Sequence, residues 1–419
     1  MVFSRALVPS LILSIIGLAA ACGSSDRDPV SANADGGAGN GAGNGQPGFG
    51  GPGTEPSDAT PPAVGTLTGK VVMPEGTIPV SDALVYLTSQ VPDPIPTGAY
   101  CDKCVALSSY AFTYSKPDGT FELPAYATGD QYLVVQKGQF RRYRTITVVP
   151  GPQVVPDGRT RLPGKNNAQL GDTVPRMLIW PGSWDHVERS LKKIGLEEFD
   201  KFEPGFDFNA PAAKMKEFPN YHMIFLPCSG TVKLGESPQC GVLVDDGLMN
   251  ASKDFVAKGG KLYVTDWSYE YVRQGWKGAL TWEGESAQIG SACQGGGGEA
   301  AASWDDPSLK NWMVAIGEGR ASVQGAWTTL KSANPVPVVD ENGATKTEAP
   351  KVWVSSGGRP TTVSFQDRCG RVLYSTYHTE GSDSSIGGTG EFLAQEKALM
   401  HILLEVGVCV GPKPQPPPK

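Results

Sequence analysis

The segment KGGKLYVTDWSYEY, residues 258–271, decides the fold predicted for this chain. A Gly-Gly turn leads into the β-branched and aromatic run 262–265, which predicts a short strand. The run breaks at Asp266-Trp267, which we call the elbow, and a helix is expected to begin there. A strand, a tight turn and a helix in this order are typical of an open α/β sheet. Such turns lie at the carboxyl edge of the sheet, where ligand sites are usual.

Apolar runs alternate with helical patterns on both sides of this segment. Further strands are expected at 176–180, 221–228, 351–356, 359–365 and 370–379. Helices are expected at 184–196, 246–257 and 391–406. This alternation predicts a three-layer, flavodoxin-like α/β domain over residues 170–410, with a parallel sheet and helices on both faces.

Residues 274–350 are expected to be a long insertion over the carboxyl edge of this sheet, with one short helix near 308–316. Tryptophans concentrate around it, at positions 267, 276, 282, 304, 312 and 327. Two interpretations are open for them. They pack under an irregular loop, or they form a stacking surface for a sugar or a peptide.

Residues 64–160 have a different pattern, with short alternating strands separated by turns such as Pro117-Asp118-Gly119. This pattern predicts a small β-sandwich. The segment resembles the carboxypeptidase regulatory-like domain, a transthyretin-like sandwich of seven strands that carries no catalysis. The resemblance is carried by GKV at 69–71, ALVYL at 83–87, DGTF at 118–121 and GDQYL at 129–133.

The N-terminal residues 1–21 combine Arg5, a long apolar run and three alanines before Cys22. This is the pattern of a secretory signal peptide. The small residues before Cys22 resemble the bacterial lipoprotein box, which implies acylation of Cys22 and a lipid anchor in the cell envelope. Gly23 after the cysteine favours the outer membrane. Residues 22–63 have almost no apolar side chains and are expected to be a tether, and residues 411–419 are a Pro-rich tail.

The α/β segment resembles the class I glutamine amidotransferase-like fold, including its trehalose-utilisation-like relatives. The resemblance is carried by YHMIFLP at 221–227, FVAKGGKLYV at 255–264 and GRVLYSTYH at 370–378. Active members of that family carry a nucleophilic Cys at the elbow, and a His with an acid two places on after a late strand. Here His378 and Glu380 keep the late pattern, but the elbow holds Asp266. Cys228 lies one crossover earlier and is expected to be too far away to replace the nucleophile.

The net charge of −7 argues against a nucleic-acid partner, which would require a basic face. No cofactor and no metal site are expected. Cys101 and Cys104 form a CxxC motif, but no His or second CxxC lies in the same segment, so a local disulfide is the simplest interpretation. Among the remaining cysteines, disulfides are predicted between Cys228 and Cys240 and between Cys369 and Cys409. Cys293 would then have no partner within the chain.

Two functions remain open. The first is a lipid-anchored envelope protein with a non-catalytic binding or structural role, whose partner is a glycan or a protein of the envelope. The second is an extracytoplasmic hydrolase acting on an amide or a glycan, with Asp266, His378 and Glu380 at its site. A sensor or assembly partner is neither supported nor excluded.

Overall fold

The computed structural model describes residues 62–405 apart from short gaps at 104, 106, 108–109, 208, 230, 235–236, 242–243, 245, 293, 340–342 and 382–391. Residues 58–419 belong to one compact unit. The predicted signal peptide, Cys22, nearly all of the tether and the C-terminal tail lie outside the described residues. No helix in the described part of the chain combines the length and the apolar character needed to cross a membrane.

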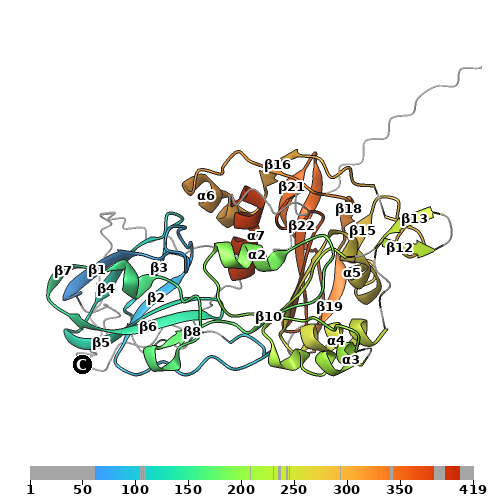
Figure 1. Ribbon diagram of the computed structural model, residues 1–419. Helices are drawn as coiled ribbons and strands as arrows, with labels where there is room; N and C mark the ends of the chain where they lie inside the picture. Colours follow the sequence, from blue (N-terminus) through green and yellow to red (C-terminus); the bar gives the residue numbers. More distant parts are fainter. Residues whose placement is uncertain are drawn as a thin grey trace, which may run out of the picture. The chain divides into compact units, whose positions relative to one another are not determined.

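The N-terminal described segment forms two small sheets (Figure 1). One has the strand order β4-β1-β7 and the other has the order β3-β2-β5-β6-β8. The strands are β1 (Gly65–Lys70), β2 (Leu84–Thr88), β3 (Phe112–Tyr114), β4 (Thr120–Ala125), β5 (Gly129–Lys137), β6 (Phe140–Val148), β7 (Gly151–Val154) and β8 (Asp172–Thr173). Neighbouring strands are antiparallel except β1 and β7.

Alternate side chains of both small sheets are buried together. Leu67 and Leu123 of the first sheet share a hydrophobic cluster with Val85 and Leu133 of the second. The turn before β4 has the geometry expected from its sequence, since Gly119 has φ +81°. The segment is therefore a two-sheet β structure, as the alternating pattern predicts.

The large sheet has the strand order β10-β9-β11-β14-β23-β22-β21-β16-β17. Its parallel half consists of β10 (Asp200–Lys201), β9 (Met177–Ile179), β11 (Met223–Leu226), β14 (Lys261–Thr265) and β23 (Gly370–Ser375). The strand of the elbow, β14, lies between β11 and β23. This arrangement gathers the carboxyl ends of three parallel strands around Asp266.

The other half of the large sheet is antiparallel. It consists of β22 (Arg359–Asp367), β21 (Lys351–Ser356), β16 (Ala300–Trp304) and β17 (Ser322–Val323). The expectation of a parallel sheet is therefore wrong for this half, and the sheet is mixed. The physical reason is the length of the connections, because turns of two residues join β21 to β22 and β22 to β23, and only antiparallel strands can be joined so tightly.

Helices cover both faces of the sheet. They are α2 (Val187–Lys193), α3 (Ala210–Met215), α4 (Asp246–Ala257), α5 (Glu270–Gly275), α6 (Pro307–Ala315) and α7 (Ala394–Leu404). Adjacent residues of β9 point to opposite faces: Met177 packs in the cluster that contains α2 and α7, and Leu178 packs in the one that contains α4 and α5. Figure 1 shows α2 and α7 on the same side of the sheet, where Lys193 pairs with Glu396 at 2.9 Å.

The segment 274–350 is more regular than expected. It contains β15 (Leu280–Trp282) paired with β18 (Leu330–Ala333), a hairpin of β19 (Val336–Val339) and β20 (Thr345–Glu348), and α6. Two of its strands, β16 and β17, extend the large sheet. Trp282, Trp304 and Trp312 are buried, so packing is the role of these three tryptophans.

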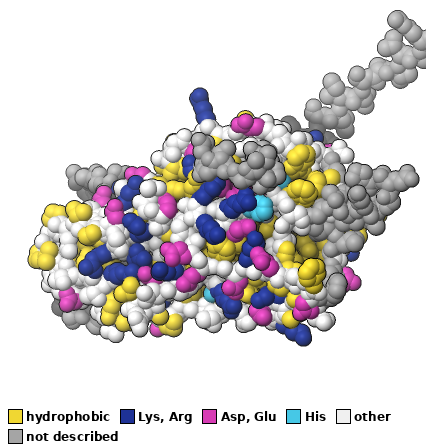
Figure 2. All heavy atoms as spheres, viewed as in Figure 1, with side chains coloured by type: hydrophobic (Ala, Val, Ile, Leu, Met, Phe, Trp, Pro, Cys, Tyr) yellow, Lys and Arg dark blue, Asp and Glu magenta, His cyan; other side chains and the backbone are white. Residues whose placement is uncertain are grey.

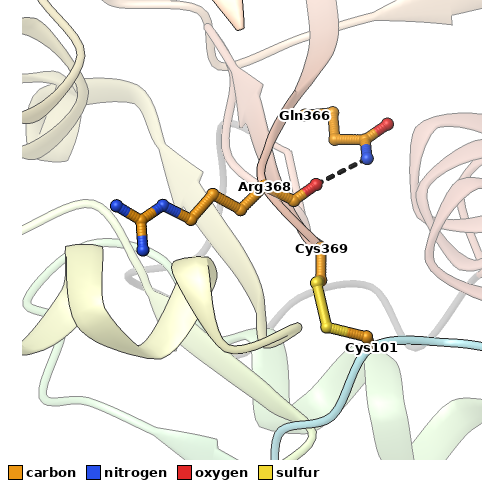
Figure 3. The surroundings of a disulfide bond; sticks show 4 residues. All are labelled: Cys101, Gln366, Arg368 and Cys369. Atoms are coloured by element: carbon orange, nitrogen blue, oxygen red, sulfur yellow. Dashed lines mark hydrogen bonds between the residues drawn. A yellow bond between two sulfur atoms is a disulfide. The ribbon is translucent and has the colours of Figure 1, made fainter. Parts of the chain in front are cut away.

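The described segments 62–160 and 170–405 contact each other directly. Trp312 of α6 donates its indole hydrogen to the carbonyl oxygen of Pro79 at 2.8 Å. A disulfide joins Cys101, in the loop after β2, to Cys369 in the turn between β22 and β23 (Figure 3). Independent folding of the two segments stays a prediction.

The disulfide corrects the pairs expected from the sequence. Because Cys101 is bonded to Cys369, neither the local pair with Cys104 nor the pair of Cys369 with Cys409 forms. Cys240 is disulfide-bonded, whereas Cys228 is a free, buried thiol, so the expected pair of these two is also wrong. The positions of Cys104, Cys293 and Cys409 fall outside the described residues.

Candidate functional site

The elbow has a backbone conformation that side chains other than glycine rarely adopt. Asp266 has φ +42° and follows directly after β14, at the start of the short helical turn Asp266–Tyr269. Aspartate tolerates the left-handed region better than most residues, but the conformation is still strained and requires support from its surroundings. Tyr374 of β23 supplies some of it by donating its hydroxyl hydrogen to the carbonyl oxygen of Asp266 at 3.1 Å.

Cys228 lies next to Asp266, which corrects the expectation that it would be too far from the site. β11 and β14 are parallel neighbours in a register that pairs Leu226 with Val264. Two residues farther on, the Cys228 thiol donates to Oδ2 of Asp266 at 3.7 Å, and the backbone N–H of Cys228 donates to Oγ1 of Thr265 at 2.7 Å. The Cys228 sulfur therefore lies within reach of the elbow carboxylate.

His378 completes a buried cluster of three. It follows β23, the strand on the other side of β14, and its Nε2 lies 3.2 Å from Oδ2 of Asp266. One ligand atom from each of Cys228, Asp266 and His378 lies within 4.8 Å of the others. The exposed fractions of the three residues are 0%, 0% and 5%. A thiol, a carboxylate and an imidazole so close together are a set that can hold a metal ion.

Asp185 is a second buried carboxylate, and sequence reasoning missed it. It accepts hydrogen bonds from the Thr265 hydroxyl at 2.8 Å and from the backbone N–H and the hydroxyl of Thr379 at 2.9 and 3.0 Å. These bonds join the loop after β9 to the loops after β14 and β23. The sequence contains one signal that could have identified Asp185 as a site residue. It lies between a predicted buried strand and a predicted helix, at the same edge of the sheet as the elbow.

Glu380 has a different partner from the one expected. Its carboxylate pairs with Arg189 of α2 at 3.1 Å. Burial raises its pKa to about 7, although the nearby Arg189 and Lys193 oppose the rise. Of the three candidates from the sequence, Asp266 and His378 are thus neighbours, and Glu380 bonds to a helix on one face of the sheet.

The thiol of Cys228 is held in its protonated form. Burial raises its pKa well above the ordinary value, and the carboxylates of Asp266 and Asp185 raise it further. The pKa of Asp266 is also raised by burial, which the neighbouring His378 only partly offsets. Burial lowers the pKa of His378, but Asp266 and Asp185 more than compensate, so it lies above the usual value. Since only a thiolate is nucleophilic, this environment disfavours thiol catalysis.

Three tryptophans line the edge of the sheet around this cluster. The ring centroids of Trp184 and Trp267 are 6.4 Å apart, as are those of Trp267 and Trp327. Each is next in sequence to a polar residue of the site, namely Asp185, Asp266 and Thr328. We call these residues the tryptophan row. Trp184 and Trp327 are 43% and 38% exposed, whereas most of the other tryptophans are buried.

Two hollows are lined by residues that neighbour the ends of the tryptophan row in the sequence, although none of the three tryptophans lines either hollow. One, of about 260 Å³, is lined by Asp185 together with the charged residues Glu188 and Lys201. The other, of about 300 Å³, is lined by Thr328, Arg359 and the glycines 295–298. A side chain at Gly297 would collide with the ring of Trp327, so glycine is required for the close packing of this loop on the row. Charged groups and aromatic rings therefore occur together along this edge.

Comparison with known proteins assigns no family. No protein-family model matches the sequence, and no curated protein matches it. Solved structures with a similar arrangement include the cytoplasmic protein STM3548 from Salmonella typhimurium, with 10% identity, TM-score 0.33, and coverage of 55% of this chain and 98% of that one. PurLQS from Thermotoga maritima has 13% identity, TM-score 0.32, and coverage of 55% and 97%.

The GH42 β-galactosidase Gan42B is also similar, with 11% identity and TM-score 0.30. The match covers 58% of this chain and 32% of the β-galactosidase, so this chain corresponds to about a third of that protein. All of these similarities are weak, and no activity is inferred from them.

Proposed function

We propose that this protein is a lipid-anchored envelope protein whose α/β domain binds a glycan along the tryptophan row without chemically changing it. The observation that carries this proposal is the row itself, because two large aromatic side chains are exposed side by side with a third. Sugar rings stack on aromatic faces through their apolar C–H surfaces. These two indoles are exposed at the edge where α/β sheets usually bind ligands.

The form of the row favours a chain of sugar rings over a single flat ligand. The ring plane of Trp267 makes an angle of 79° with that of Trp184 and of 62° with that of Trp327. The row therefore presents separate ring faces and not one plane. The two hollows carry Glu188, Lys201 and Arg359, which can bond sugar hydroxyls. Successive sugars would then stack on successive indoles, with polar contacts at both ends.

The non-catalytic part of the proposal is supported by the chemistry of Cys228. Its thiol is buried and kept protonated, and the elbow position that carries a nucleophile in the amidotransferase-like relatives holds Asp266. The location in the cell envelope is supported by the N-terminal sequence alone, through the apolar run and the small residues before Cys22. The β segment, which resembles the carboxypeptidase regulatory-like domain, would act as an accessory unit between the tether and the binding domain.

Glycan binding can be tested by titrating the full chain with soluble oligosaccharides, namely β-1,4-linked N-acetylglucosamine, β-1,4-linked glucose and α-1,4-linked glucose oligomers. Calorimetry should detect binding of at least one of them, and Trp184→Ala and Trp327→Ala should each weaken it by about fivefold or more, because stacking on one indole contributes on the order of 1 kcal/mol. Tyr114→Ala is the matched control, since Tyr114 is an exposed aromatic residue of β3 and is 40% exposed. Binding that survives both tryptophan substitutions would contradict the assignment of the row.

A hydrolase is the second candidate. One observation favours it, the approach of Cys228, Asp266 and His378 to within 4.8 Å of one another. A thiol next to an imidazole is the arrangement used by thiol hydrolases. The raised pKa of Cys228 opposes this candidate, and the reactivity of that thiol separates the two functions.

A further inference from the structure

We propose that Cys228, Asp266 and His378 bind a transition-metal ion of the zinc type, with the sulfur, one carboxylate oxygen and one imidazole nitrogen as its ligands. This goes beyond glycan binding, and it departs from the expectation of no metal site that the sequence produced. The three residues follow within three positions of the ends of β11, β14 and β23, which are successive parallel neighbours in the sheet. The fold therefore fixes their spacing through three strands and not through one flexible loop.

The distances between the ligand atoms suit a tetrahedral ion. Oδ2 of Asp266 is central, 3.7 Å from Sγ of Cys228 and 3.2 Å from Nε2 of His378. With the usual zinc bond lengths and tetrahedral angles, the separation of sulfur and oxygen is about 3.5 Å and that of nitrogen and oxygen is about 3.3 Å. These two separations are within a few tenths of an ångström of the zinc geometry. The third side, between Sγ and Nε2, is at most 4.8 Å and would measure about 3.6 Å around a tetrahedral ion.

His378 provides an independent reason to expect a ligand. The residue is 95% buried by its exposed fraction of 5%, yet neither ring nitrogen makes a hydrogen bond of good geometry in the described chain. Nδ1 has no partner in the described chain, and the nearest partner of Nε2 is the Asp266 carboxylate, 3.2 Å away, with which it forms an ion pair. A buried polar atom without a partner is costly, on the order of 1–3 kcal/mol. A metal bond to this nitrogen would remove that cost.

The surroundings orient the Asp266 ligand. The second carboxylate oxygen of Asp266, Oδ1, accepts a hydrogen bond from Thr328 at 2.8 Å, which leaves Oδ2 directed at the other two ligands. Thr328 is itself 2.7 Å from the Tyr374 hydroxyl. Such bonds orient ligand groups before the ion arrives. Asp185 adds another buried negative group nearby, so a doubly charged cation would be favoured electrostatically over an empty cluster.

The ligand types select the ion. Calcium and magnesium prefer sets made of oxygen alone, whereas a mixed sulfur, nitrogen and oxygen set suits zinc. Three protein ligands leave one position for water or for another group, as in zinc sites that are not closed by four side chains. On binding, the Cys228 thiol releases its proton to the solvent, and the thiolate sulfur replaces one water of the hydrated ion.

The test uses the full chain, purified with an affinity tag that contains no histidine, stripped with a chelator and dialysed against Zn²⁺. We expect one more equivalent of tightly held zinc in the parent than in Cys228→Ser, Asp266→Asn or His378→Ala. His401→Gln is the matched control, because His401 is also a buried histidine 3.0 Å from a carboxylate, that of Glu405, but lies outside the cluster. Its zinc content should equal that of the parent.

A spectrum of the parent protein avoids dependence on the folding of variants. Co²⁺ in place of Zn²⁺ should give a thiolate-to-cobalt charge-transfer band in the near ultraviolet and d–d bands of tetrahedral intensity. Zinc should also protect Cys228 from alkylation in the unmodified chain. Equal zinc content in the parent and in Cys228→Ser, or a cobalt spectrum without the thiolate band, would overturn the proposal.

Discussion

The thiol of Cys228 lies 3.7 Å from a carboxylate oxygen of Asp266, although the two residues are 38 positions apart. The contact arises because β11 and β14 are parallel and in register, so their carboxyl ends bring the residues that follow them together. It places a buried, protonated thiol beside the carboxylate of the elbow. The chemistry of this edge therefore depends on what the cluster of Cys228, Asp266 and His378 holds.

The reactivity of Cys228 is the first prediction. Without added metal, iodoacetamide should label Cys228 at least tenfold more slowly in the native chain than in the urea-unfolded chain, because each unit by which burial raises the pKa reduces the thiolate tenfold. Peptide mass spectrometry measures labelling at this residue alone. His378→Ala should not slow the reaction further. Rapid labelling that requires His378 would instead favour the hydrolase.

The disulfide between Cys101 and Cys369 should stabilise the protein. The bond spans 268 positions and joins the N-terminal segment to the turn between β22 and β23, in which Arg368 has φ +51° and its carbonyl accepts from Gln366 (Figure 3). Replacing both cysteines with alanine should lower the free energy of unfolding by about 2–5 kcal/mol. Urea denaturation measures the loss. An unchanged midpoint would show that the bond contributes nothing.

Glu405 should make stability depend on acid pH. Its burial alone would raise the pKa, but Lys137 and His401 lower it to about 2 from the ordinary 4.5. Because the folded-state pKa is the lower one, the carboxylate stabilises the fold above about pH 4.5, and this contribution, on the order of 2–3 kcal/mol, is lost as the pH falls toward 2. Lys137 belongs to β5 and lies 3.3 Å from Glu405, so the pair also links the two segments.

Glu405→Gln provides the measurement for this pair. The variant should be less stable than the parent at neutral pH, and the difference should disappear as the pH is lowered through the range from 4.5 to 2. Urea midpoints at a series of pH values give both curves. A constant difference at all pH values would mean that the charge of Glu405 is not the cause.

Cys22 is predicted to carry the lipid anchor. Cys22→Ser should move the protein from the membrane fraction to the soluble fraction, because acyl chains on the cysteine would provide the attachment. Fractionation followed by immunoblotting measures the distribution. The same distribution for parent and variant would contradict the anchor.

Local patterns allowed most elements to be predicted, but not the direction of every strand. The helix expected at 246–257 is α4, and the run at 262–265 lies within β14. Apolar spacing and bounding glycines suffice for such elements. The antiparallel half was missed, although Gly357 and Gly358 mark a turn too short for a parallel crossover. Attention to connection length would have shown it.

The site was predicted in part. The resemblance to the amidotransferase-like fold predicted that Asp266 and His378 would be neighbours. Nε2 of His378 lies 3.2 Å from Oδ2 of Asp266. The positions of Cys228 and Asp185 depend on the register and order of neighbouring strands, which no local pattern contains. The bond between Cys101 and Cys369 depends on how two distant segments meet, and spacing along the chain carries no information about that.

Lys, Arg, Asp and Glu side chains are interspersed over the face of the molecule shown in Figure 2. The tryptophan row is the proposed glycan site. The indole N–H signals of the tryptophans offer a direct test. Trp312 and Trp353 donate to Pro79 and Ser364 inside the protein, at 2.8 Å in both cases, and serve as internal references.

The measurement is a nitrogen–proton correlation spectrum of the full chain labelled with ¹⁵N-tryptophan, recorded while a binding oligosaccharide is added. The indole signals of Trp184, Trp267 and Trp327 should shift together with one dissociation constant, and those of Trp312 and Trp353 should stay in place. Trp267 is the most informative, because it lies between the other two tryptophans of the row. Shifts confined to other tryptophans, or none with any oligosaccharide, would contradict the account.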